Sequence, residues 1–130
     1  MEDLTSFFHR YGDAHLKLSG DALAPFFHIP GLINDLGGVH AISSHDDLAT
    51  YHAPFIAELT KARLAICKAM LTEQQSALPG GARAVVSFRF GNETNDLIFD
   101  CDYAFALMRV EQDWKIVFAQ LGEIRYSDLY

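Results

Sequence analysis

Two carboxylates lie inside a run of strand-forming residues, NDLIFDCDYAFALM, at positions 95–108. Side chains of a strand alternate between its faces, so Asp100 and Asp102 share one face with Ile98, Ala104, Ala106 and Met108, while the other face carries Phe99, Cys101, Tyr103, Phe105 and Leu107. In the ordinary interpretation the aromatic face packs on the core and the acidic face meets water. In the alternative, the acidic face lines a ligand cavity and a second subunit covers the aromatic face.

The first third of the chain holds further groups able to handle protons. Apolar and aromatic residues at spacings of three and four predict a helix over 3–18, with Tyr11 and His15 one turn apart on its apolar face. Asp35 ends an extended stretch, FHIPGLIND, and precedes Gly37-Gly38. It is therefore either a turn residue that bonds its own backbone or a carboxylate placed at a strand end for chemistry.

Helices and strands that could position these residues follow in a clear order. A short helix is expected at 21–27, two short strands at 27–35 and 39–43, and a helix at 44–63 with a kink or restart at Pro54. Strands are expected at 62–74, 82–90, 97–110 and 114–124, joined by short polar turns. This order predicts one α+β domain over 1–130, with three N-terminal helices packed against a cone-like curved antiparallel sheet.

Composition excludes several classes of function. The formal charge of -7 is unsuited to a nucleic-acid backbone or an anionic membrane surface. No apolar run is long enough to span a bilayer and the N-terminus lacks the blocks of a secretion signal, so we expect a cytoplasmic protein. The six histidines form no HExxH motif and the cysteines are not paired in sequence, so we expect neither a metal nor a cofactor.

The order of elements resembles the nuclear transport factor 2-like superfamily over nearly the whole chain, including the Trp114–Val117 run that opens the last strand. Within that superfamily four short strings are similar to the ketosteroid isomerase and polyketide cyclase-like branch. They are His9-Arg10-Tyr11, Ile33-Asn34-Asp35, Asp102-Tyr103-Ala104-Phe105 and the Ala119–Glu123 stretch. Asp100 departs from the pattern, because it adds a second carboxylate two residues before Asp102.

The resemblance implies roles for three catalytic candidates. Asp35 would move a proton next to a carbonyl, and Tyr11 with Asp102 would donate hydrogen bonds to the resulting oxyanion. The candidate binding residues are His15, Phe55, Asp100 and Leu121.

These candidates predict a pocket for a small hydrophobic or cyclic ligand, in a homodimer that pairs through the sheet face. An isomerase or cyclase is one expectation for its function. A non-catalytic ligand-binding or protein-interaction module is another, and a cofactor-free dehydratase or hydrolase is the third, because the fold alone does not decide between them.

Overall fold

Helices and strands follow one another in the order that the sequence predicts. The structure is a computed structural model that describes residues 2–76 and 79–126. Its helical elements are α1 (Leu4–Ala14), η1 (His15–Lys17), α2 (Gly20–Leu23), η2 (Ala24–Phe26) and α3 (His45–Lys61). Its strands are β1 (Phe27–Asp35), β2 (Gly38–Ile42), β3 (Leu64–Ser76), β4 (Gly81–Asn92), β5 (Leu97–Val110) and β6 (Asp113–Tyr126). Helix α3 runs unbroken through Pro54, so the helix does not restart there.

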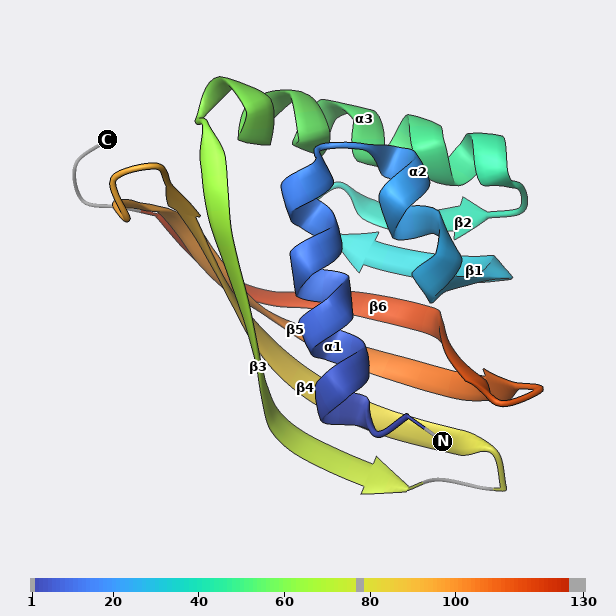
Figure 1. The fold of residues 1–130 in the computed structure, drawn as a ribbon. Helices are drawn as coiled ribbons and strands as arrows, with labels where there is room; N and C mark the ends of the chain where they lie inside the picture. The colour runs from blue at the N-terminus through green and yellow to red at the C-terminus, as the bar shows by residue number, and fades with distance from the viewer. Residues whose placement is uncertain (1, 77–78, 127–130) are drawn as a thin grey trace.

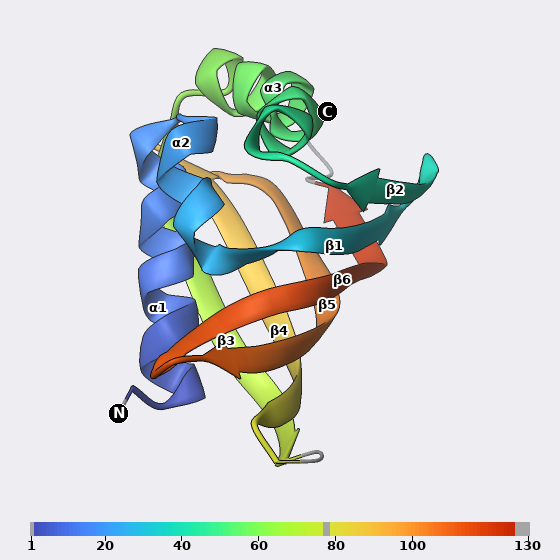
Figure 2. The same cartoon turned by 90° about the vertical axis from the view of Figure 1, so that its right-hand side faces the viewer.

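The strands form one curved sheet in the order β2-β1-β6-β5-β4-β3. The helices lie on its concave side, with α1 across the sheet and α3 over one end (Figure 1). The view turned by 90° shows β1 and β2 extending beside β6, below α3 (Figure 2). This confirms the predicted α+β class and the curved sheet packed against N-terminal helices. The pairings are antiparallel except between β1 and β6, which run parallel.

Helix α1 is held by its N-cap and by an apolar stripe. The Asp3 carboxylate accepts a 2.8 Å hydrogen bond from the Ser6 amide, which satisfies an N–H group that the helix itself leaves unpaired. Phe7 and Phe8 are fully buried, and the ring of Phe8 lies 4.9 Å from that of Phe105 on β5. Burying one such ring stabilises the fold by roughly 1.5–3 kcal/mol. The stripe therefore fixes α1, and with it Tyr11 and His15, against the concave face.

Strand β5 follows ordinary alternation from Phe99 onward, whereas Ile98, expected on the acidic face, is buried beside a register shift between β4 and β5. Cys101, Phe105 and Leu107 are buried on the concave side, whereas Asp100 and Asp102 are partly exposed on the opposite side. The interpretation in which the acidic face lines a cavity is therefore wrong. In the part of the chain that the structure describes, no helix has both the length and the apolarity to cross a membrane.

Candidate functional site

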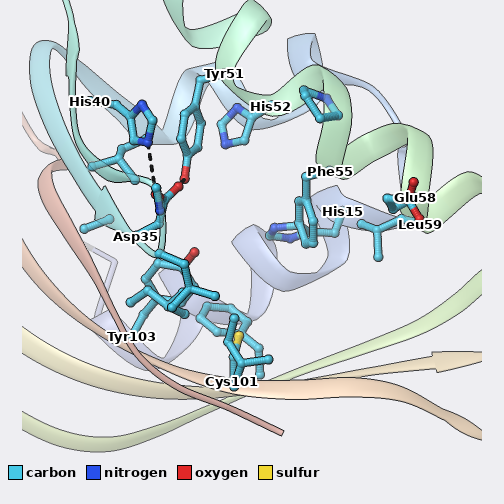
Figure 3. Close-up of a pocket in the computed structure, with 18 of the residues that line it drawn as sticks. His15, Asp35, His40, Tyr51, His52, Phe55, Glu58, Leu59, Cys101 and Tyr103 are labelled. Atoms are coloured by element: carbon cyan, nitrogen blue, oxygen red, sulfur yellow. Dashed lines mark hydrogen bonds and ion pairs between the residues drawn. The ribbon is translucent and has the colours of Figure 1, made fainter. Parts of the chain in front are cut away.

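A cavity of about 1410 Å³ lies between the concave face of the sheet, the β1–β2 hairpin and α3. It is open on one side, and it exceeds the roughly 300–1,000 Å³ that ligand pockets commonly have. Aromatic and aliphatic side chains form most of the lining, including Phe27, Phe55, Phe88, Phe90, Phe105 and Leu121. The polar side chains of His15, Asp35, His40, Tyr51, His52 and Tyr103 are set among them (Figure 3). The cavity thus offers an apolar body with a small number of placed polar groups.

Asp35 is the most densely hydrogen-bonded carboxylate of the lining. Its Oδ2 accepts a 2.6 Å hydrogen bond from the Tyr51 hydroxyl, and its Oδ1 accepts from His40 Nε2 at 3.0 Å and from the Gly37 amide at 2.8 Å. The Gly37 contact is the turn interaction considered for this residue. The bonds from α3 and β2 add a second role, because they hold the carboxylate at the cavity wall (Figure 3).

These contacts set the ionisation of Asp35. Partial burial alone would raise the pKa of its carboxyl group, but the hydrogen bonds from Tyr51, His40 and the Gly37 amide outweigh burial and lower the pKa. Asp35 is therefore an ionised acceptor at neutral pH. The resemblance to ketosteroid isomerase implies a base of modestly raised pKa, and here the shift runs in the opposite direction.

Three tyrosines contribute hydroxyl groups to the cavity lining. Burial raises the pKa of Tyr11 well above its ordinary value, with smaller contributions from Tyr103 and Cys67. Burial also raises the pKa of Tyr103, assisted by Cys101 and by the negative charge of Asp35, and it raises that of Tyr51, assisted by its bond to Asp35. All three hydroxyls stay protonated at neutral pH and act as hydrogen-bond donors. Figure 3 shows Tyr103 rising from the sheet toward Asp35 and Tyr51.

Two buried histidines also belong to the polar lining. His15 and His52 are each only 5% exposed, and burial lowers the pKa of both rings to about 4. Backbone carbonyls of Tyr11 and Gly12 favour the protonated form of His15 but do not offset burial. Repulsion from His15 when that ring is protonated lowers the pKa of His52 further, and a hydrogen bond to the Leu48 carbonyl opposes this shift. Both imidazoles are therefore neutral at pH 7.

Asp102 does not join Tyr11 and Asp35. It lies on the convex face, where it accepts hydrogen bonds from Ser87 Oγ at 2.7 Å and from Arg125 at 3.0 Å. Asp100 also pairs with Arg125 there. The catalytic role implied for Asp102 and the binding role implied for Asp100 are therefore wrong, because β5 points both carboxylates away from the cavity. At the position next to Asp102, the inward side chain is Tyr103.

The remaining candidates belong to the cavity lining. Tyr11, His15, Asp35, Phe55 and Leu121 all line the cavity. Sequence reasoning did not assign functional roles to His40, Tyr51 and Tyr103, and it considered His52 only as a partner for an aspartate in a dehydratase. The apolar stripe of α3 carried a signal for Tyr51 and His52, and the alternation of β5 carried one for Tyr103. Among the described residues, no cluster of three or more His, Cys, Asp or Glu side chains is arranged to hold a metal ion.

No family model matches this sequence, and no curated protein matches it. Many solved structures do match. A nuclear transport factor 2-like protein of unknown function from Shewanella oneidensis superposes with a TM-score of 0.72 at 13% identity, over 92% of this chain and 96% of that one. A domain of unknown function with a cystatin-like fold from Nostoc punctiforme also gives 0.72, at 15% identity over 95% and 75% of the two chains.

A proposed aromatic ring hydroxylase from Novosphingobium aromaticivorans gives a TM-score of 0.65 at 16% identity, over 95% of this chain and 90% of that one. Identities this low carry the fold and not the activity. The agreement over nearly the whole chain matches the order of elements and the curved sheet described above. This chain therefore has the nuclear transport factor 2-like fold, the architecture also described as cystatin-like.

Proposed function

We propose that this protein binds a small, ring-containing carbonyl compound in its cavity and moves a proton on it. The observation that carries the proposal is Asp35, an ionised carboxylate held by Tyr51 and His40 at the wall of a largely apolar cavity. A general base needs to lie beside its substrate in the unprotonated form, and the lowered pKa of Asp35 meets that condition at neutral pH.

The proton transfer would proceed through an enolate. Asp35 removes a proton from the carbon next to the carbonyl, and the electron pair of the broken C–H bond moves to form the enolate with its negative charge on oxygen. The hydroxyls of Tyr103 and Tyr11 are protonated donors on the concave side, suited to stabilise that oxygen. Protonated Asp35 then returns the proton to the same or another carbon of the substrate. Tyr103 takes the donor role that the resemblance assigned to Asp102.

Exchange of carbon-bound protons tests the proposal directly. Cyclohexanone, 2-tetralone and a steroid 3-ketone would be incubated with the protein in D₂O, and loss of the α-proton signals followed by NMR. We expect exchange above the buffer rate for at least one of them, and a fall of roughly 10²–10⁴-fold in Asp35→Asn, as expected for a lost general base. Asp46→Asn, which changes an exposed carboxylate of α3, is the matched control and should retain full exchange.

Two other results have defined meanings. If the ketones bind without exchange, the cavity belongs to a ligand-binding module rather than an enzyme. If Asp35→Asn exchanges as fast as the unaltered protein, Asp35 is not the base and the proposed mechanism is wrong.

A further inference from the structure

His15 is a buried histidine whose tautomer is fixed by its surroundings. Its Nδ1 lies 2.9 Å from the carbonyl oxygen of Tyr11. A carbonyl can only accept a hydrogen bond, so Nδ1 carries the proton and donates it. Since the ring is neutral, Nε2 presents a lone pair. The position of Tyr11 one turn earlier in α1 thus determines which nitrogen of His15 can accept.

This Nε2 lone pair opens into the cavity. No residue in the described ranges forms a hydrogen bond with Nε2 of His15. Within those ranges, Nδ1 of His52 is the single side-chain nitrogen or oxygen that is both sealed from solvent and unpartnered, so the unpartnered Nε2 of His15 is not sealed. His15 lines the cavity, and its ring extends toward the open space beneath α3 (Figure 3). Rings of Phe55, Phe88 and Phe90 surround it at centroid distances of 5.5–6.3 Å. His15 is therefore a single acceptor set in an aromatic wall.

Charges around the cavity restrict what can meet this acceptor. The lining includes the carboxylates of Asp35, Asp47 and Glu58 and one lysine, Lys61. Glu58 and Lys61 lie 3.8 Å apart with side chains 73% and 78% exposed, so the charge held at the cavity wall is the Asp35 carboxylate. Both buried imidazoles are neutral at pH 7. An anionic ligand would lose hydration and meet like charge, which disfavours its entry. The cavity is thus suited to a neutral molecule.

We propose that His15 is a specificity-determining residue that binds a hydroxyl group through Nε2, and that the ligand is a neutral ring-containing alcohol, phenol or enol. The inference rests on the proposed binding of a ring-containing carbonyl compound in this cavity. It specifies a second polar group of that ligand, a hydroxyl. A hydroxyl can donate to a fixed lone pair, whereas an ether or a hydrogen at the same position cannot. The Phe55, Phe88 and Phe90 rings would contact the ring that bears it.

The test compares probes that differ in one donor. Binding of 2-naphthol, 2-methoxynaphthalene and 2-naphthoate to the full chain would be measured by calorimetry at pH 7. We expect 2-naphthol to bind roughly tenfold more tightly than the methoxy compound, as one buried hydrogen bond allows, and 2-naphthoate to bind more weakly than either. Equal affinity for naphthol and its methyl ether overturns the role of His15 while leaving ring binding intact. No binding of either neutral probe overturns this inference, and it overturns the proposed binding function as well only when the ketones of the exchange assay also fail to bind.

Two variants of His15 separate recognition from packing. The amide of His15→Asn can keep the bond to the Tyr11 carbonyl but removes the acceptor at Nε2, so the preference for naphthol should disappear while the affinity for 2-methoxynaphthalene is kept. His15→Gln can return an acceptor oxygen to that place and should restore part of the preference. Circular dichroism would confirm that both variants fold.

A measurement on the unaltered protein covers the case in which the variants unfold. The ¹⁵N chemical shift of His15 Nε2 should be that of an unprotonated nitrogen in the free protein and should move toward the hydrogen-bonded value with 2-naphthol alone. An Nε2 that is protonated in the free protein, or one unaffected by naphthol, overturns the proposal.

Discussion

The Tyr51 hydroxyl and the Asp35 carboxylate are joined by a 2.6 Å hydrogen bond that links α3 to the end of β1. The bond has two consequences. It stabilises the ionised carboxylate at the cavity wall, and it fixes the helix that covers the cavity to the strand that carries the proposed base. Because the two residues are 16 positions apart in sequence, only the fold brings them together.

Tyr51→Phe should raise the pKa of Asp35, because it removes one of the hydrogen bonds that favour the charged form. The midpoint of the Asp35 side-chain ¹³C titration would move to higher pH, and the acid limb of any proton-exchange profile would move with it. Tyr11→Phe is the matched control, since Tyr11 lines the same cavity without bonding Asp35. An unchanged Asp35 midpoint in Tyr51→Phe would contradict the assignment.

Acid should destabilise the protein before most carboxylates titrate. The pKa values of His15 and His52 are about 4 in the fold and 6.5 ordinarily, so the unfolded chain binds more protons between these limits. Stability is therefore complete above pH 6.5 and falls as the pH drops toward 4, by about 3 kcal/mol for each buried ring. Urea unfolding at pH 7.5, 5.5 and 4.5 measures this loss.

His52→Gln should reduce the dependence of stability on pH in that window, because glutamine does not titrate. The stability lost through protonation of His15 and His52 is distinct from the stability lost through Asp35. The pKa of Asp35 is lowered, so its contribution to the free energy of unfolding disappears at more acidic pH. Equal unfolding free energies at pH 7.5 and 4.5 would show that the two imidazoles are not buried in neutral form.

Asp102→Asn should leave ligand binding and proton exchange unchanged. The carboxylate bonds Arg125 and Ser87 on the convex face, with its side chain 33% exposed. Exposed ion pairs contribute little to stability, so we expect only a small decrease in Tm. Tyr103→Phe is the contrasting variant, because its hydroxyl belongs to the cavity side of the same strand and its loss should slow exchange. A loss of exchange in Asp102→Asn equal to that in Asp35→Asn would instead support the role of hydrogen-bond donor to the oxyanion that the resemblance implied for Asp102.

The element order was predictable because its signals are local. The helical stripe of α1, the cap at Ser44 and the alternation of β5 each depend on near neighbours in sequence. Tyr11, Asp35 and His15 were also predicted to be site residues, and they line the cavity. The resemblance predicted that Asp102 also belongs to the site, whereas alternation along the strand predicted that it faces outward. The structure agrees with alternation, so strand periodicity was the better predictor for Asp102.

The partners of Asp35 could not be found in the same way. His40 and Tyr51 reach it only because the β1–β2 hairpin and α3 converge at the end of β1. Nothing in the spacing of these residues fixes that approach. The parallel pairing of β1 with β6 was likewise unpredictable, since it joins segments at opposite ends of the chain.

Gly31→Ala should destabilise the protein by about 1–3 kcal/mol, the usual cost of overpacking. A Cβ at this position of β1 would lie 2.9 Å from the His28 carbonyl oxygen and 3.3 Å from that of Val117. Both neighbours are backbone atoms, His28 in β1 itself and Val117 in β6, so the backbone of β1 would have to change its local shape as well as move relative to β6. Thermal unfolding measures the loss. Gly20→Ala, whose Cβ would meet only ordinary contacts, should be close to neutral, and a neutral Gly31→Ala would contradict this packing.

We propose that two copies pair through the convex face of the sheet. Met70, Ala104 and Met108 are exposed on strands β3 and β5 there. The sheet therefore carries apolar side chains on both of its faces, which favours a partner that covers the outer one. Light scattering should then give about twice the 14.5 kDa mass of one chain. Ala104→Arg would place a charge at the middle of this face and should yield monomers that still bind naphthol, because the cavity lies on the other face. Leu16→Arg, on the helical side, should remain dimeric. A monomeric unaltered protein at micromolar concentration would refute the pairing and leave the convex face as solvent-exposed surface.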